Sequence, residues 1–98
     1  MAGKIYINDI GTALILNTLA DISSATVINY KFKRPDGSTF LRTGSFVTNG
    51  ADYLLRYITQ DGDMDIDGDW QMQSYLEMPT WRGHSQIVDF SVYRHLAL

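Results

Sequence analysis

The sequence contains no cysteine, few basic residues and no long apolar run. The absence of cysteine excludes a disulfide scaffold and a thiolate zinc site. The eight Lys and Arg residues are scattered and are outnumbered by eleven Asp and Glu, which gives a formal net charge of −3. Because binding to phosphates needs a basic stripe, we expect no nucleic-acid partner.

The short hydrophobic runs also limit the class of protein. No stretch approaches the roughly 18 consecutive apolar residues of a transmembrane helix. After Lys4, the N-terminal stretch has no long apolar segment, so we expect neither a signal peptide nor a membrane partner.

What the chain does contain suits one small domain. Of its 98 residues, 45% are hydrophobic and 12% are aromatic, which is too apolar for a disordered tail. A chain of this length buries roughly 60–65% of its unfolded surface, enough for one core but without room for a deep substrate cleft. We therefore expect residues 1–98 to form a single domain.

Seven short segments have the alternation or the residue content of β-strands, with turn residues between them. They span residues 4–7, 12–16, 25–34, 39–47, 53–58, 69–78 and 87–93. A helix over residues 12–20 is the alternative for the second segment, but turn residues follow it so closely that a strand is favoured. The spacing predicts an all-β fold, an antiparallel β-sandwich of about seven strands.

Turn signals and face patterns refine this prediction. The Pro-Asp-Gly triplet at 35–37 predicts a hairpin, in which residues 39–47 fold back against residues 25–34, and Gly44 predicts a bulge or bend in the returning strand. In the segment 69–78, alternate residues from Trp70 to Leu76 share one face, so we expect Trp70 to anchor the core. Trp81 lies beside a turn and should be more open.

Five of the eleven acidic residues lie within nine positions, between Asp61 and Asp69. The favoured interpretation is a connecting loop with Asp-Gly turns, in which glycine supplies positive φ. The alternative is a calcium site of a type other than the EF-hand: the loop matches the opening of a calcium-binding loop, but position twelve is Ser74 instead of glutamate. The candidate ligands are Asp63, Asp65, Asp67 and Asp69.

No residue pattern points to catalysis, and we expect no enzyme. His84 and His95 lack metal-ligand spacing, and His84 cannot activate Ser85 merely by adjacency, because neighbouring strand residues point to opposite faces. The aspartate loop has carboxylates, but an exposed turn neither desolvates nor positions them for general acid–base chemistry. Apart from the calcium alternative, no cofactor is expected.

Six short segments, in order, carry a resemblance to a known family. They are Lys-Ile-Tyr-Ile at 4–7, Asp-Ile-Gly-Thr at 9–12, Asp-Ile-Ser with Ala-Thr at 21–26, Lys-Arg-Pro-Asp-Gly at 33–37, Asp-Met-Asp-Ile-Asp-Gly-Asp-Trp at 63–70 and Phe-Ser-Val-Tyr at 90–93. This order resembles the small immunoglobulin-like virion proteins of tailed bacteriophages, and is similar to the N-terminal domain of phage baseplate upper proteins. The resemblance implies a non-catalytic structural part of the particle, assembled in the host cytoplasm: a tail, baseplate, neck or capsid-decoration module.

Two functions follow from these observations. A virion subunit would bind other virion proteins, or repeated copies of itself in a symmetric assembly, through edge strands and apolar surface. The candidate interface residues are Ile5, Tyr6, Ile7, Trp81, Leu96 and Leu98. The alternative is an adhesion or ligand-binding module, in which Tyr6, Tyr75 and Trp81 form a recognition patch, with or without calcium.

Overall fold

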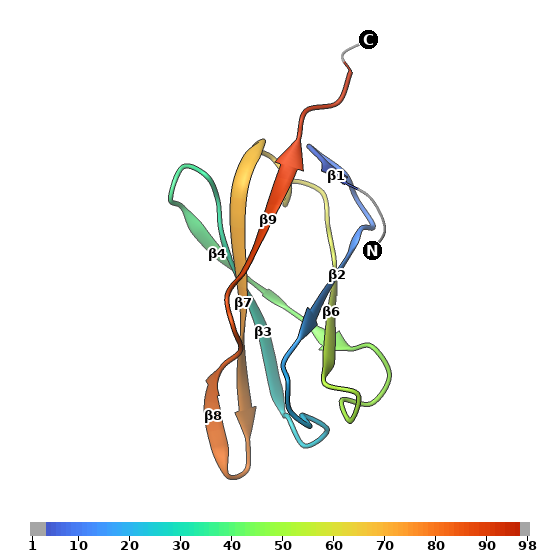
Figure 1. Ribbon diagram of the computed structural model, residues 1–98, viewed down its shortest axis with the longest axis vertical. Coiled ribbons are helices and arrows are strands. Elements are labelled where there is room, and N and C mark those ends of the chain that lie inside the picture. Colours follow the sequence, from blue (N-terminus) through green and yellow to red (C-terminus); the bar gives the residue numbers. More distant parts are fainter. Residues whose placement is uncertain (1–3, 97–98) are drawn as a thin grey trace.

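The computed structural model describes residues 4–96, which form nine β-strands and no helix. The strands are β1 (Ile5–Tyr6), β2 (Ala13–Asn17), β3 (Val27–Lys33), β4 (Thr39–Thr43), β5 (Ser45–Phe46), β6 (Leu54–Ile58), β7 (Gly68–Met78), β8 (Trp81–His84) and β9 (Val88–Tyr93). One sheet has the order β1-β9-β7-β3-β4, with β8 paired to β7, and the other has the order β2-β6-β5. The fold is therefore all-β, with two curled sheets in a sandwich-like arrangement (Figure 1). Within residues 4–96 no segment qualifies as a membrane-spanning helix.

The long strand β7 organises the larger sheet. It pairs antiparallel with β3 over seven residues, from Val27 opposite Glu77 to Lys33 opposite Gln71. Strand β9 pairs antiparallel with the other side of β7, and the short β1 pairs parallel with β9. Thus β1 and β9, from the two ends of the described chain, lie side by side (Figure 1).

The predicted hairpin after β3 is confirmed. Its turn is closed by backbone hydrogen bonds from Arg34 N to Ser38 O and from Gly37 N to Arg34 O. Gly37 has a φ of 89°, a conformation that L side chains rarely adopt. The second predicted segment is strand β2, so the helical alternative for residues 12–20 is wrong.

The structure has nine strands where the sequence predicts about seven, for two reasons. The predicted strand 39–47 divides at Gly44: β4 pairs with β3, and β5 pairs with β6 in the other sheet. A side-chain carbon at Gly44 would lie 2.7 Å from the Tyr30 ring, so glycine lets the chain cross closely over the core. The second addition is β8, which pairs with β7 and lies between the predicted segments 69–78 and 87–93.

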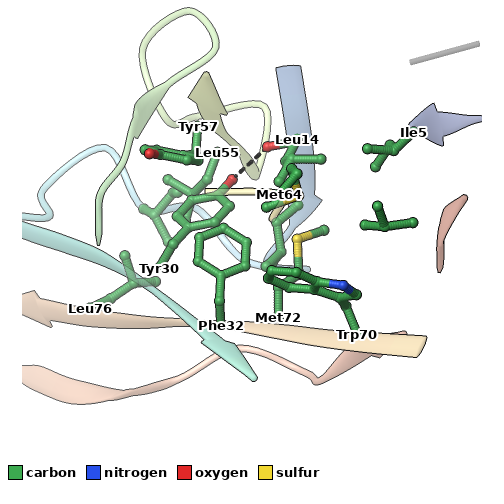
Figure 2. Packing of buried hydrophobic residues seen from close by; sticks show 13 residues of the cluster. Ile5, Leu14, Tyr30, Phe32, Leu55, Tyr57, Met64, Trp70, Met72 and Leu76 are labelled. Carbon is green, nitrogen blue, oxygen red and sulfur yellow. Dashed lines mark hydrogen bonds between the residues drawn. The ribbon is translucent and has the colours of Figure 1, made fainter. Parts of the chain in front are cut away.

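Side chains from both sheets fill the space between them (Figure 2). Trp70 is 1% exposed and its indole nitrogen donates a hydrogen bond to Ile66 O at 2.9 Å, which confirms its predicted place in the core. The Tyr30 hydroxyl donates to Leu14 O at 3.0 Å, so a hydrogen bond joins the two sheets through the core. The predicted inward face of β7 is also confirmed, because Trp70, Met72, Ser74 and Leu76 are all buried.

Candidate functional site

The aspartate-rich loop between β6 and β7 contributes to the core. Asp63 and Met64 are fully buried, and both carboxylate oxygens of Asp63 have partners. Oδ1 accepts hydrogen bonds from Arg42 Nε at 3.0 Å and pairs with Arg42 Nη2 at 2.9 Å. Oδ2 accepts from Gln60 N at 2.8 Å and from the Tyr57 hydroxyl. The loop is therefore anchored by one buried acid, which the sequence analysis placed in an exposed turn.

The other candidate calcium ligands have separate partners. Asp65 pairs with Arg34 at 3.0 Å, Asp67 pairs with Arg94 at 3.2 Å, and Asp69 accepts a hydrogen bond from Ser91 at 3.2 Å. Across residues 4–96, no three acidic or histidine side chains gather closely enough to hold a metal ion. Calcium binding by Asp63, Asp65, Asp67 and Asp69 would require these pairings to rearrange, and it stays a prediction.

Two tyrosines next to these contacts have shifted ionisation. Burial, with the hydrogen bond to Asp63, raises the pKa of Tyr57 to about 12. Burial also raises the pKa of Tyr30, the side chain that joins the sheets. In both cases the neutral hydroxyl fits the folded structure better than the phenolate does, because the phenolate would lose hydration.

The first predicted interface segment is divided between core and surface. Ile5 is 3% exposed and packs in the core, whereas Tyr6 is 39% exposed. Because side chains alternate along a strand, Ile5 cannot share the outer face with Tyr6. Ile7 is partly buried against the core. Ile5 therefore serves folding, and Tyr6 is the residue of β1 that a partner can reach.

Exposed apolar groups gather where β1 meets the end of β9. The rings of Tyr6 and Tyr93 lie 6.4 Å apart, and the Lys4 ammonium lies 4.8 Å from the centre of the Tyr93 ring. Leu96 follows and is 90% exposed; it lines an open hollow with Tyr6. We call Tyr6, Tyr93 and Leu96 the terminal edge. Leu98 lies outside the described residues.

Trp81 stands at the opposite end of the molecule, on the hairpin of β7 and β8 (Figure 1). It is 45% exposed, as the sequence predicts. A side-chain carbon added to Gly83 would lie 2.4 Å from the Trp81 ring, so the indole rests directly on the Gly83 backbone. This contact holds the ring against Gly83, and the residue as a whole stays 45% exposed.

A small apolar hollow lies between this hairpin and the β2–β3 loop. Its volume is about 140 Å³. The loop contributes Thr18, Ala20 and Ile22, and the hairpin with the residue after it contributes Leu76, Met78, Trp81, His84 and Ser85. We call it the hairpin-end hollow. The sequence analysis missed it, because the hollow depends on β8 and on a contact between distant segments.

The predicted adhesion patch does not form one surface. Tyr6 lies on β1 and Trp81 on the hairpin at the other end of the long axis (Figure 1). Tyr75 lies between them on β7, where its ring is 5.2 Å from that of His84. Its hydroxyl donates to Glu77 Oε2 at 3.1 Å, and burial and this bond raise the pKa of Tyr75.

His84 and Ser85 make contacts with different groups. His84 Nε2 lies 2.9 Å from Lys31 Nζ. The Ser85 hydroxyl accepts a hydrogen bond from Ser74 N at 3.0 Å and donates one to Gln86 O at 3.2 Å. The serine hydroxyl is thus engaged with backbone groups, and the histidine contacts the outer face of the larger sheet. His95 lies after β9, where its Nδ1 is 3.0 Å from Leu96 O.

Comparisons with protein-family models, with curated proteins and with solved structures gave no match.

Proposed function

We propose that the chain is a non-enzymatic, immunoglobulin-like structural subunit of a bacteriophage particle, working through protein–protein interfaces. Its partners are other virion proteins and further copies of itself in a symmetric assembly, within a tail, baseplate, neck or capsid decoration. The observation that carries this proposal is the terminal edge, where two exposed tyrosines and a leucine that is 90% exposed lie together at the border of the larger sheet.

The strand order supports the immunoglobulin-like part of the proposal. In that fold, strands B, E and D lie together in one sheet, and strands C, F and G in the other, with an added strand beside C in the variable type. The order β2-β6-β5 corresponds to B-E-D, and β9-β7-β3-β4 corresponds to G-F-C with the added strand. Trp70, near the start of β7, bonds back to Ile66 O at 2.9 Å, in the place where such domains carry a tyrosine bonded to the upstream backbone.

The physical properties of the terminal edge suit assembly. Strand β1 covers only two residues, and its outward backbone groups are already bonded, because Tyr6 N donates to Asp9 Oδ2 at 3.0 Å and Asp9 N donates to Tyr6 O at 3.1 Å. A partner therefore meets the exposed side chains of Tyr6 and Tyr93 there, and not a free strand edge. Burying the exposed Leu96 side chain in an interface would stabilise the complex by about 1.5–3 kcal/mol, the usual gain for a side chain of this kind. One such contact binds weakly, but repeated copies in a symmetric particle multiply weak contacts.

Sedimentation velocity of the purified chain and of a Tyr6→Asp variant tests this proposal. We expect the unaltered chain to self-associate as its concentration rises, and the variant to associate less, because a carboxylate would then enter the interface. A matched control is Leu41→Asp, since Leu41 is 56% exposed on β4 and lies outside the terminal edge. If neither substitution changes association, the terminal edge is not the interface.

The exposed Trp81 above an apolar hollow favours a second candidate, an adhesion or ligand-binding module. The exposed part of the Trp81 side chain offers an apolar contact for a sugar ring. A glycan-binding screen with the unaltered chain and Trp81→Ala, in calcium and in chelator, tests this candidate. Binding that requires Trp81 would place adhesion ahead of the subunit proposal.

A further inference from the structure

The hairpin-end hollow has the size of one side chain. Its volume is about 140 Å³, and a cavity of roughly 150 Å³ lined by aliphatic and aromatic groups holds one benzene-sized molecule. Its lining includes Ile22 and Leu76, which are each 1% exposed, and the half-exposed Trp81. A single branched aliphatic group therefore matches the hollow in both volume and polarity.

The loop beside the hollow is held in an unusual conformation. Leu19 has a φ of 62° and Tyr53 has a φ of 71°, values that bulky residues rarely adopt. Thr18 connects the segment of Leu19 to that of Tyr53, because its backbone N and its hydroxyl donate hydrogen bonds to Tyr53 O at 2.8 Å and 2.9 Å. Asn17 Oδ1 accepts a hydrogen bond from Leu19 N at 2.9 Å. Backbone strain of this kind clusters at binding sites. Leu19 is 67% exposed and lies in the sequence between Thr18 and Ala20, both of which line the hollow.

The most exposed large apolar side chain of residues 4–96 is Leu96, at the other end of the long axis. The segment after β9 extends away from the sandwich at the upper end of Figure 1, whereas the β7–β8 turn lies at the lower end. An exposed leucine and a hollow of matching size therefore lie at opposite ends of one molecule. Their placement suits a contact between copies more than a contact within one copy.

The charges near the two ends are complementary. Arg94 lies two residues before Leu96; its side chain is 82% exposed and has only Nε engaged, with Asp67 at 3.2 Å. The remaining guanidinium donors can bind a second carboxylate. On the acceptor side, Asp21 lies between Ala20 and Ile22, both of which line the hollow. Hydrogen bonds from Ser23 lower the pKa of Asp21, so this carboxylate is charged near neutral pH.

We propose that the hairpin-end hollow receives the Leu96 side chain of a second copy, with Arg94 of that copy beside Asp21, so that copies associate head to tail. The inference rests on the proposed function, because it names the surface that receives the terminal edge. Such a contact joins two different surfaces, so the copies form a ring where the rotation closes and an open chain where it does not.

Light scattering after size exclusion, on single variants over a concentration series, tests each side of the contact. We expect Leu96→Ala to weaken association about tenfold or more, because one buried aliphatic contact is lost. Trp81→Ala and Ala20→Arg should weaken it as well. Ala20→Arg changes an exposed loop position and fills the hollow without removing a core side chain, so it tests the hollow even if Trp81→Ala folds poorly. Leu41→Asp should associate as the unaltered chain does.

The charge contact has its own matched pair of variants. Asp21→Asn keeps the hydrogen bond to Ser23 N but removes the charge, and should weaken association roughly two- to five-fold, the effect of one exposed ion pair. Asp36→Asn is the control, since Asp36 makes the same kind of turn contact with Ser38 N on the hairpin after β3. Equal effects of the two substitutions would overturn the role of Asp21.

Mixing two defective variants tests whether Leu96 of one copy enters the hollow of another. The Leu96→Asp variant still has an intact hollow, and the Ala20→Arg variant still has Leu96. Each should be monomeric alone, and the mixture should form a one-to-one dimer that grows no further, because each dimer has one intact contact and no second one to offer. A mixture that stays monomeric, or that grows beyond a dimer, overturns the proposal.

The outcomes separate this inference from the proposed function. If Tyr6→Asp abolishes association while Ala20→Arg leaves it unchanged, the hollow is not the acceptor and the subunit proposal stands. If the unaltered chain stays monomeric at every concentration, both the head-to-tail contact and the self-association in the proposed function are overturned. If that monomer also binds a glycan through Trp81, the adhesion alternative replaces the proposed function.

Discussion

Arg42 of β4 and Asp63 of the β6–β7 loop form an ion pair in which the carboxylate is fully buried and the guanidinium side chain is 39% exposed. The pair connects an edge strand of the larger sheet to the segment that leaves the smaller sheet. Since Asp63 also accepts hydrogen bonds from Tyr57 and from Gln60 N, the pair fixes the start of the aspartate-rich loop. This loop therefore has a structural role in closing one end of the sandwich.

Replacing Asp63 should destabilise the fold. Asp63→Asn leaves the Arg42 cation without its buried partner, and breaking a buried ion pair costs about 3–5 kcal/mol of the free energy of unfolding. We expect the lower part of this range, because Arg42 is 39% exposed and keeps contact with water. The control is Asp65→Asn, whose ion pair with Arg34 is partly exposed, with an expected loss below about 1 kcal/mol. Urea unfolding measures both, and equal losses would contradict the buried role of Asp63.

Replacing Trp70 should have a comparable effect for a different reason. Trp70→Ala removes the largest fully buried side chain and its hydrogen bond to Ile66 O. Emptying a core aromatic site costs about 3–5 kcal/mol. Trp81→Ala is the matched control, because Trp81 is 45% exposed and leaves no closed cavity. A loss under about 1 kcal/mol for Trp70→Ala would show that this residue does not anchor the core.

Stability should fall in alkaline solution through the buried tyrosines. The pKa of Tyr57 is about 12 in the folded chain, compared with about 10 in an unfolded chain. A raised folded pKa means that the folded state holds its proton more tightly, so this contribution is complete below about pH 10 and is lost as the pH rises toward about 12. Tyr30, whose pKa is also raised by burial, adds to the same decline.

Urea midpoints measured from neutral pH to about pH 12 test this expectation. The decline should be shallower in Tyr57→Phe, which has no titrating hydroxyl, although the variant loses the bond to Asp63. An identical slope for Tyr57→Phe and the unaltered chain would show that Tyr57 does not set the alkaline limit.

Calcium should leave the stability of the chain unchanged. Asp63, Asp65 and Asp67 are each paired with an arginine, so an ion would have to displace these cations. Thermal unfolding in excess calcium and in chelator gives the comparison, since an ion that binds only the folded state raises the midpoint. A rise that disappears in Asp67→Asn would contradict this expectation and establish the calcium site.

Local patterns predicted the parts of the fold that local chemistry determines. The alternation in residues 69–78 identified the buried face of β7, and the Pro-Asp-Gly triplet identified the hairpin after β3. Strand β8 was missed because Trp-Arg-Gly-His has no apolar alternation, and it forms only by pairing with β7. At Gly44 the sequence predicted only a bulge or bend. It did not predict that the chain changes sheet there, because the partner of β5 is β6, a strand that follows later in the sequence.

The site was harder to predict than the fold. Asp63 was placed in an exposed turn because its partner, Arg42, lies 21 positions away in the sequence. A signal was present: Arg42 shares its face of β4 with Phe40, which packs against the core, and an inward-facing arginine calls for a buried carboxylate. The hairpin-end hollow left no such signal, since its walls come from two segments that meet only in the folded chain.

The central claim is that this chain works by associating with copies of itself and with neighbouring proteins. Light scattering after size exclusion, on the unaltered chain over a range of concentrations, in calcium and in chelator, tests it most directly. The account predicts a mass that rises with concentration, equally in both solutions. A monomer at every concentration, or association that depends on calcium, would contradict it.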